Sequence, residues 1–304
     1  DSLQRLLTAL LIGGGLLTLL AGFAGYILAA RTLAPIDEIT HAARRISTED
    51  LSARLDLPDT GDEVSRLAST FNEMLNRIEL GFRRERQFTA DASHEMRTPL
   101  TAMQAILSVT RQRRRKPVEY EQALDDLSEE AERLRTLTES LLALARTDLH
   151  PIALTETVDL STLLEDVTES LRPLADAKGL ALAFETEASL NLRGDADGLI
   201  RLFINLLDNA IKYTEQGQIS ISAQRIGENV CVEVSDTGIG IQPEYLPHIF
   251  ERFYRVEQSR TQRGTGLGLA IAQQIVQAHV GHIDAKSISG EGTTIKVFLP
   301  AILG

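Results

Sequence analysis

A long stretch near the start of the chain is predominantly apolar and free of charge, unlike everything that follows it. Residues 6–30 include no charged residue, and a helix of that length can cross a hydrocarbon core of about 30 Å. We therefore predict a transmembrane helix over residues 3–30, with a buried helix of a soluble domain as the alternative. A signal peptide is disfavoured because the apolar stretch is long and a regular helical pattern comes after it.

Residues 31–83 have the pattern of two amphipathic helices joined by an extended connector. Apolar residues recur at helical spacing before residue 47 and again after residue 62, and spaced leucines occur in the connector, residues 51–61. Two short amphipathic helices cannot bury their apolar stripes alone. This segment is therefore expected to form a dimeric bundle.

Two long helices are expected next. The helix that begins near residue 62 meets no stop signal before about residue 113, and after a turn at Pro117 a second helix is expected over Glu119–Thr147. The apolar positions of that second helix alternate at spacings of four and three, as in a coiled-coil seam. The seam consists of Leu127, Ala131, Leu134, Thr138, Leu141 and Ala145. Two antiparallel helices make half of a four-helix bundle, so the pattern predicts a homodimer.

From about residue 155 the pattern changes to short strands mixed with helices. Asp195 is expected to cap one of these helices at its N-terminus, and a turn at Gly227 joins two strands in a hairpin. The expected helices span residues 160–178, 195–213 and 267–279, and the expected strands span residues 180–186, 190–193, 218–225, 229–235, 282–287 and 293–299. The pattern predicts an α/β sandwich with helices on one face of a mixed sheet.

Charge and cysteine content exclude some classes of function and indicate where the chain is located. The net charge of −12 argues against nucleic-acid binding as the default function. Arg31, Arg44 and Arg45 follow the apolar helix, so the positive-inside rule puts the remainder of the chain in the cytoplasm. The single cysteine, Cys231, excludes an internal disulfide, and the six histidines lack zinc-ligand spacing. Because the sequence begins with Asp1 rather than Met, we expect an upstream part beyond this chain.

The first long helix contains a candidate nucleophile. His94 and Thr98 lie one turn apart on one helical face, with Glu95 beside them, and Pro99 is expected to bend or loosen the helix at the histidine. A neutral imidazole offers a lone pair at pH 7, and a neighbouring carboxylate can hold its N–H and stabilise the imidazolium that forms on attack. The alternative is a surface histidine on a charged helix.

The α/β part contains residues that suit a phosphorylated ligand. Asn205 and Asn209 lie one turn apart on an otherwise apolar helix and are followed by Lys212. Two amides on an apolar helix need a polar partner, and magnesium with phosphate groups would provide one. Asp236 ends a strand before a glycine turn, where its carboxylate could accept a hydrogen bond from an adenine amino group.

A glycine-rich turn at residues 264–269 supports the same interpretation. It opens a helix, whose backbone N–H groups can cradle phosphate. Its spacing matches neither a Walker loop nor a dinucleotide fingerprint. The long polar connection before it, residues 241–263, suits a lid. Each motif is weak alone, and their order along one chain makes them specific.

Together these motifs resemble a membrane-bound sensor histidine kinase of two-component signalling. The resemblance covers roughly residues 31–304. It implies a multidomain chain in which the helix at residues 3–30 is followed by three domains. These are a HAMP linker at 31–83, a HisKA dimerisation and phosphotransfer domain at 84–150, and an ATP-binding catalytic domain of the GHKL (HATPase, Bergerat) fold at 155–304.

The resemblance implies roles for the residues around the nucleophile. His94 is similar to the phosphoacceptor of the H box, and Glu95 would act as the general base for its attack on ATP. Thr98 would help to orient a water that dephosphorylates a bound regulator. These roles describe a kinase that also has the reverse, phosphatase activity.

The resemblance also implies the nucleotide-binding residues. Asn209 and Asn205 of the N box would lie at Mg²⁺, Lys212 would contact phosphate, and Tyr213 would line the nucleotide pocket. The remaining implied residues are Asp236, Gly238 and Gly240 of the G1 box, Arg252 and Arg255 of the F box, and Gly264, Gly266 and Gly268 of the G2 box.

The implied activity is that of a protein-histidine kinase in the bacterial inner membrane. Mg-ATP would phosphorylate His94, and the phosphoryl group would pass to an aspartate in the receiver domain of a separate response regulator. An ATPase of the wider GHKL group is disfavoured, because such chaperones and topoisomerase subunits carry a glutamate where Asn205 stands. A non-enzymatic adaptor with an inactive kinase fold is disfavoured because His94, Asn209 and Asp236 are intact.

Overall fold

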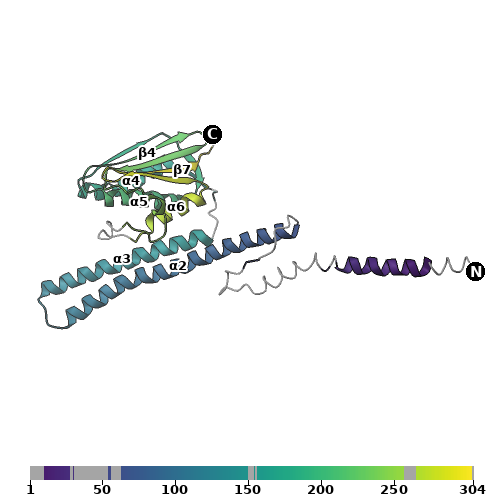
Figure 1. Ribbon diagram of the computed structural model, residues 1–304. Helices are drawn as coiled ribbons and strands as arrows, with labels where there is room; N and C mark the ends of the chain where they lie inside the picture. Colours follow the sequence, from purple (N-terminus) through teal and green to yellow (C-terminus); the bar gives the residue numbers. More distant parts are fainter. Residues whose placement is uncertain are drawn as a thin grey trace, which may run out of the picture. The chain divides into compact units, whose positions relative to one another are not determined.

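The computed structural model describes residues 10–27, 30, 54–55, 63–149, 154, 156–256 and 265–302 (Figure 1). The chain divides into two compact units, Asp1–Thr89 and Ala90–Gly304. The first helix expected in the HAMP-like segment and most of its connector lie outside the described residues.

The N-terminal helix, Leu10–Ile27, carries no charged residue and is exposed along its length. Its mean hydropathy is 1.9, and none of it is buried by the described chain. Leu11, Leu17 and Leu19 each leave about 70% or more of their surface exposed, with values of 70%, 72% and 74%. The helix is long and apolar enough to cross a membrane, as the sequence predicts.

In the first unit a short connector segment is fixed to the helix α2, Glu63–Arg111. The Leu55 N–H donates to Asn72 Oδ1 at 2.9 Å, and Asn72 Nδ2 donates back to the Leu55 carbonyl at 3.0 Å. Leu55 and Leu75 are buried. Asn72 thus satisfies both the N–H and the carbonyl of Leu55.

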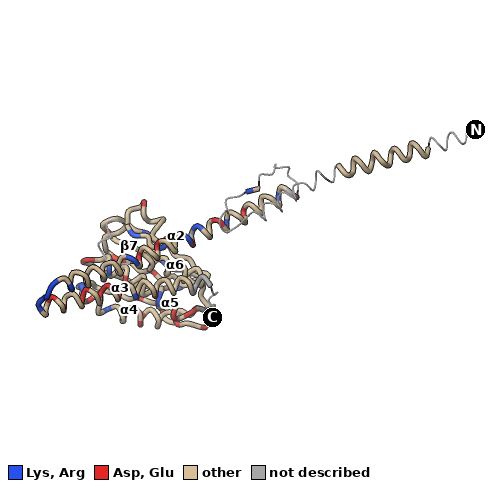
Figure 2. Tube along the Cα trace, turned by 90° about the horizontal axis from the view of Figure 1, so that it is seen from below, with Lys and Arg blue, Asp and Glu red and all other residues tan. Residues whose placement is uncertain are grey.

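The helix α2 continues without a break through Pro99, and a turn then leads into α3, Pro117–Leu149. Pro117 occupies the first position of α3, where its missing N–H costs no hydrogen bond. The Glu119 carboxylate accepts from the Lys116 N–H at 2.9 Å, as in a capping box. Basic residues cluster around the turn, at positions 111 and 113–116, and are coloured blue in Figure 2.

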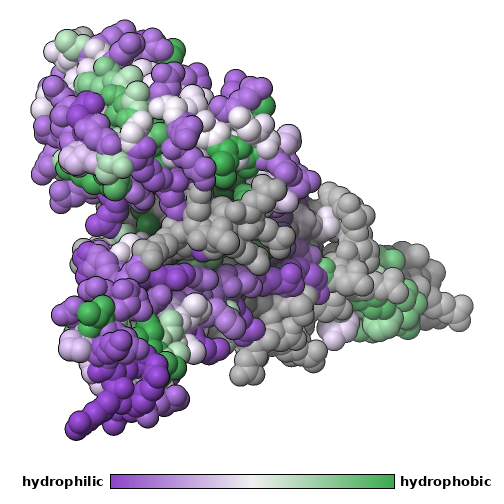
Figure 3. Space-filling view, turned by 90° about the vertical axis from the view of Figure 1, so that its left-hand side faces the viewer, coloured by the Kyte–Doolittle hydropathy of each residue, from purple (hydrophilic) through white to green (hydrophobic). Residues whose placement is uncertain are grey.

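The helices α2 and α3 retain exposed apolar surface in the single chain. Leu107 and Leu124 are 48% and 65% exposed, and Leu142 is 59% exposed. Hydrophobic residues show among the hydrophilic ones near the turn of the α2–α3 hairpin (Figure 3). Half of a four-helix bundle has this character, because its inner face is covered only by a second copy.

The α/β part is built on a five-stranded mixed sheet with its main helices on one face (Figure 1). The strand order is β2-β4-β5-β7-β6, in which β2 runs parallel to β4 and the other neighbours are antiparallel. The strands are β1 Glu156–Asp159, β2 Ala181–Thr186, β3 Asn191–Gly194, β4 Gln218–Ile226, β5 Asn229–Asp236, β6 His282–Ile288 and β7 Gly292–Pro300. The helices are α4 Leu160–Ala177, α5 Ala196–Tyr213 and α6 Gly268–Ala278, with a short helix η1 at Leu246–His248.

Alternating side chains of the sheet meet the apolar faces of the helices to form the core. In β4 Ile219 and Ile221 are buried and point to one face, and Val232 and Val234 do so in β5. Phe203 of α5 is fully buried. The fold class predicted from the sequence is therefore confirmed, with an α/β sandwich after the helical segments.

Two local expectations differ from the structure. The pair β1–β3 forms a separate two-stranded sheet, and β1 was not expected. Asp195 stands at the N-cap of α5 but makes no side-chain capping bond, so that prediction is wrong in its chemistry. Instead, the Asp195 N–H donates to Nε2 of the buried His279 at 3.0 Å, while Nδ1 of that ring donates to the Ile275 carbonyl at 2.8 Å.

The end of α6 provides a test of backbone strain. The N–H of Gly281 donates to the Val276 carbonyl and that of Val280 to the Gln277 carbonyl, which is the Schellman pattern with a left-handed residue after the cap. That residue is Val280, with φ of 57° and 75% exposure. A β-branched residue is strained in this conformation.

We predict that Val280→Gly stabilises the α/β domain by about 1 kcal/mol, because it removes the left-handed strain and only an exposed side chain. Thermal and urea unfolding would measure the change. Val280→Ala is the matched control, since it retains a Cβ in the same conformation and should recover less. Equal stability of the two variants would contradict the explanation.

Candidate functional site

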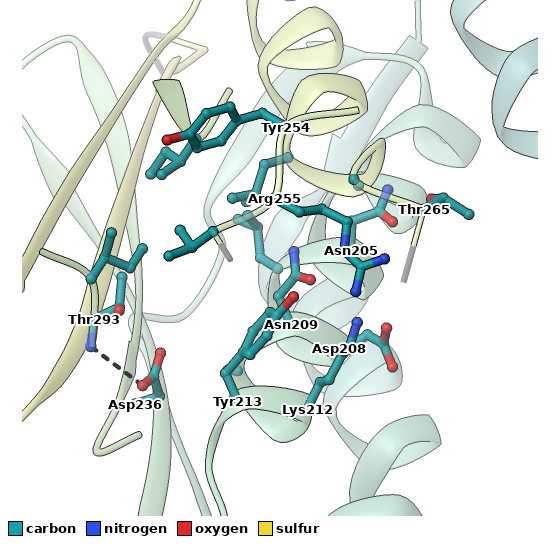
Figure 4. Close-up of a pocket in the computed structure, with 18 of the residues that line it drawn as sticks. Asn205, Asp208, Asn209, Lys212, Tyr213, Asp236, Tyr254, Arg255, Thr265 and Thr293 are labelled. Carbon is teal, nitrogen blue, oxygen red and sulfur yellow. Dashed lines mark hydrogen bonds between the residues drawn. The ribbon is translucent and has the colours of Figure 1, made fainter. Parts of the chain in front are cut away.

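A cavity of about 520 Å³ opens between α5, the ends of β5 and β7, and the first turn of α6 (Figure 4). This volume lies within the usual range of small-molecule sites. Residues of α3 also line it, and all of these elements belong to the second unit. The cavity therefore unites segments that are far apart in the sequence.

The helix α5 has one face in the core and another in the cavity. Asn205, Asp208, Asn209 and Lys212 follow one another at spacings of three, one and three residues and all line the cavity. A Cβ built at Gly268 would lie 3.3 Å from Asn205 Oδ1 and 3.6 Å from Asn209 Nδ2. Both amides thus face the N-terminal turn of α6, where free backbone N–H groups favour an anion.

Asp236 lies at the opposite side of the cavity, at the end of β5. Its Oδ1 accepts hydrogen bonds from the N–H of Gly238 at 2.8 Å and of Thr293 at 3.3 Å (Figure 4). Among the described residues, nothing donates to Oδ2. Burial raises the pKa of Asp236, although the two backbone bonds oppose the shift. The carboxylate is thus held in place with one oxygen left for a donor on a ligand.

Glycines permit the close approach of backbone around the cavity. Gly240 has φ of +64°, and a Cβ there would lie 2.0 Å from the Ile288 carbonyl oxygen. Gly266 has φ of +69°, and its Cβ would meet the backbone of Phe253. No side chain fits at either position. Gly264 and residues 257–263 of the preceding connection lie outside the described residues.

The structure brings together most of the residues that the sequence singled out. The predicted residues that line the cavity are Asn205, Asn209, Lys212, Tyr213, Asp236, Gly240, Arg255, Gly266 and Gly268. Gly238 lies behind the site, where a Cβ would come within 2.3 Å of the Tyr213 carbonyl oxygen. Arg252 does not line the cavity in this structure.

The candidate nucleophile lies outside the cavity. His94 and Thr98 are exposed on α2, and Glu95 is partly buried. The Thr98 hydroxyl donates to the His94 carbonyl at 3.3 Å. Within the described part of the chain, no hydrogen bond joins the Glu95 carboxylate to the His94 ring. The structure therefore shows the cavity and the histidine apart.

Comparison with known proteins gives the family. Family models match residues 194–302 (histidine kinase-, DNA gyrase B- and HSP90-like ATPase), residues 84–150 (His Kinase A phospho-acceptor domain) and residues 27–80 (HAMP domain). The sensor protein CutS of Streptomyces coelicolor is 36% identical over 302 residues, which are 98% of this chain and 72% of CutS. The chain belongs to the sensor histidine kinases.

Further relatives agree with this assignment. The signal transduction histidine-protein kinase BaeS of Escherichia coli K12 is 35% identical over 304 residues, 99% of this chain and 64% of BaeS. The crystal structure of histidine kinase ThkA in complex with the response regulator protein TrrA matches with a TM-score of 0.59 at 23% identity. The match covers 79% of this chain and 68% of that one. At this identity the match shows the fold.

Several cavity residues of this kinase were not predicted. Asp208 shares the α5 face of the two asparagines, so helical spacing alone could have indicated it. Thr293 could not be found in this way, because it reaches Asp236 only through the pairing of β5 with β7. Tyr254, within the lid connection, and Thr265, just after it, also line the cavity.

The donor set fits a magnesium ion that is bound together with phosphates. The two amides of α5 converge beside Gly268, and amide oxygens are hard ligands suited to Mg²⁺. Among the described residues, no group of three or more His, Cys, Asp and Glu could hold a metal without a ligand. Since Mg²⁺ is commonly held by few protein groups and by substrate phosphates, Asn205 and Asn209 would hold it with a triphosphate present.

Lys212 is the titratable group most affected by the cavity. Its ammonium lies 5.0 Å from the centre of the Tyr213 ring. Desolvation, followed by the positive charge of Arg255, lowers the pKa of Lys212 to about 8, while Asp208 acts in the opposite direction. Desolvation also raises the pKa of Asp208. An anionic ligand would remove the electrostatic part of this cost.

We predict that Mg-ATP binds more weakly as the pH rises through about 8, the pKa of Lys212. A phosphate binds the protonated ammonium more tightly, so the dissociation constant should rise above this pH by up to about tenfold per unit. Titrations at pH 7, 8 and 9 would measure it. Lys212→Arg should flatten the profile because guanidinium stays charged. A flat profile in the parent chain would contradict the prediction.

Proposed function

We propose that this sensor histidine kinase transfers the γ-phosphoryl group of Mg-ATP to His94 and then to an aspartate of a response regulator. The supporting observation is the cavity, which holds a fixed carboxylate, Asp236, at one side and Lys212 with two amides at the other. A carboxylate suits an adenine amino group, and a cation beside glycine N–H groups suits a triphosphate.

The chemistry at His94 balances with the groups present. One ring nitrogen attacks the γ-phosphorus, and the bond from that phosphorus to the bridging oxygen breaks, so ADP leaves with the electron pair. The Glu95 carboxylate takes the proton from the other ring nitrogen. Mg²⁺, when bound, neutralises charge on the phosphates. Lys212 and Arg255 would bind the same oxygens, so the protein contributes mainly positioning and charge.

Phosphoryl transfer requires a second arrangement of the same unit. His94 is exposed and does not line the cavity, whereas residues of α3 do. Reacting atoms must approach to about 3–3.5 Å. We infer that the catalytic domain leaves α3 to deliver ATP to His94, and that Glu95 engages the ring in that state.

The exposed surfaces of the helices support proposals for the partners of this chain and for its location in the cell. The apolar positions on α2 and α3 favour a homodimer. His94 and Thr98 lie on one exposed face, which leaves room for the receiver domain of a response regulator, the kind of partner that ThkA binds in its complex with TrrA. The N-terminal helix would anchor the chain in the bacterial inner membrane, with the domains after residue 31 in the cytoplasm.

We predict that incubation with γ-labelled ATP places an acid-labile, base-stable label on the chain, and that His94→Gln abolishes it. Glutamine keeps the polarity of the exposed site but has no nucleophilic nitrogen. His282→Gln is the matched control, since His282 is also exposed and lies beside a carboxylate, that of Asp284, at 2.9 Å. Label that persists in His94→Gln would refute His94 as the acceptor.

The regulator phosphatase activity has a separate test. We propose that the Thr98 hydroxyl orients water toward the phosphorylated aspartate, so Thr98→Ala should slow regulator dephosphorylation about tenfold or more while His94 is still labelled. Thr101→Ala is the control, because Thr101 is exposed and makes the same kind of bond, to the Arg97 carbonyl at 2.8 Å. Equal rates for the two variants would exclude this role.

A further inference from the structure

Arg133 of α3 lines the nucleotide cavity although it belongs to the helical hairpin. It lies on a helical face with Glu129, Thr136 and Ser140, which also line the cavity, at spacings of three and four residues. Arg133 is partly buried. No proposed role in ATP binding or phosphotransfer uses this side chain.

The two neighbouring arginines of α3 differ in their partners. Arg135 is exposed and paired with Glu132 and with Glu139, the latter at 2.6 Å. Arg133 has no ion pair among the described residues. The guanidinium of Arg133 thus lies at the cavity with no carboxylate bound to it, and an anionic ligand would provide a partner.

Positive charge is concentrated around Lys212. The charges that act on it are the carboxylate of Asp208 and three cations, Arg255, Lys178 and Arg133. Three glutamates of α3, Glu129, Glu130 and Glu132, also line the cavity. Glu132 is paired with Arg135, and none of the three is among the charges that act on Lys212. Cations of α3, α5 and the lid connection thus converge where a triphosphate would lie.

The helix α3 also packs against α6 further along its length. Gln274 of α6 donates from Nε2 to the Leu144 carbonyl at 3.2 Å, and Leu144 is 1% exposed. Leu144 lies eleven residues after Arg133, about three turns along α3. The contact with α6 and the contact with the cavity therefore belong to one docked arrangement of α3.

We propose that Arg133 is a third cationic ligand for the phosphates of ATP, used only while α3 is docked over the cavity. Bound ATP then fastens α3 to the catalytic domain and restrains its own transfer to His94. This inference rests on the proposed function and deepens it, since it gives a residue of the hairpin a part in nucleotide binding. By linkage, ATP and docking strengthen each other equally.

The test compares Arg133→Gln with the parent chain in lipid nanodiscs. Dissociation constants are measured for Mg-ATP, Mg-ADP and adenosine, together with the first-order rate of His94 labelling at saturating ATP. We expect the ATP constant to rise about tenfold, the ADP constant to rise less and the adenosine constant to stay within about twofold. The labelling rate should rise, because the lost contact exists only before transfer. Arg135→Gln, the matched control, should behave as the parent in all four measurements.

Three outcomes would overturn the inference. The first is an unchanged ATP constant in Arg133→Gln, which leaves the proposed function standing. The second is equal weakening for adenosine, ADP and ATP, and the third is slower labelling; either would indicate a structural role. A parent chain that binds ATP but never labels His94 would refute the proposed function instead, while the affinity comparison would still decide the role of Arg133.

Discussion

The constraint on which this structure depends is that α5 serves the core and the site at once. Leu199, Leu202 and Phe203 are fully buried on one face, and burial of each such side chain contributes about 1.5–3 kcal/mol. That packing fixes the rotation of the helix. Asn205 and Asn209 must then face the first turn of α6. The apolar face thus positions polar groups that would be unfavourable without a ligand.

The pKa shifts in the cavity show that placing these polar and charged groups there is unfavourable in the absence of a ligand. The pKa of Lys212 is lowered to about 8 by desolvation and by neighbouring positive charge, and the pKa of Asp236 is raised by burial. Both shifts mean that the free protein holds charged groups in places that disfavour charge. Groups with this pair of opposite shifts on two sides of one cavity are typical of a functional site. A ligand with a donor at one end and an anion at the other satisfies both.

Periodicity predicted the fold well wherever packing follows local sequence. The continuous helix through Pro99 and the helices over residues 160–178 and 195–213 needed only apolar spacing, and their observed ends differ by a residue or two. Periodicity could not predict the contacts that depend on strand pairing or on packing between helices. Thr293 reaches Asp236 through sheet register, β1 depends on β3, and the backbone of Asp195 bonds to His279 from another helix.

The motif residues of the site could be found from the sequence because glycine, amide and carboxylate patterns are local. The α3 residues at the cavity could not be found in this way, because their position depends on how α3 docks.

In this structure His94 is apart from the cavity while α3 lies against it, and two of the docking contacts can be given an energy. The observed contact between α3 and α6 includes a neutral hydrogen bond, from Gln274 to Leu144, with a net contribution of about 1 kcal/mol. Burial of Leu144 contributes about 2 kcal/mol. A difference of a few kcal/mol leaves the undocked state populated at about 0.1–10%. A ligand or a helix movement that discriminates between the states by a similar amount would therefore shift the population of the undocked state, which we propose delivers ATP to His94.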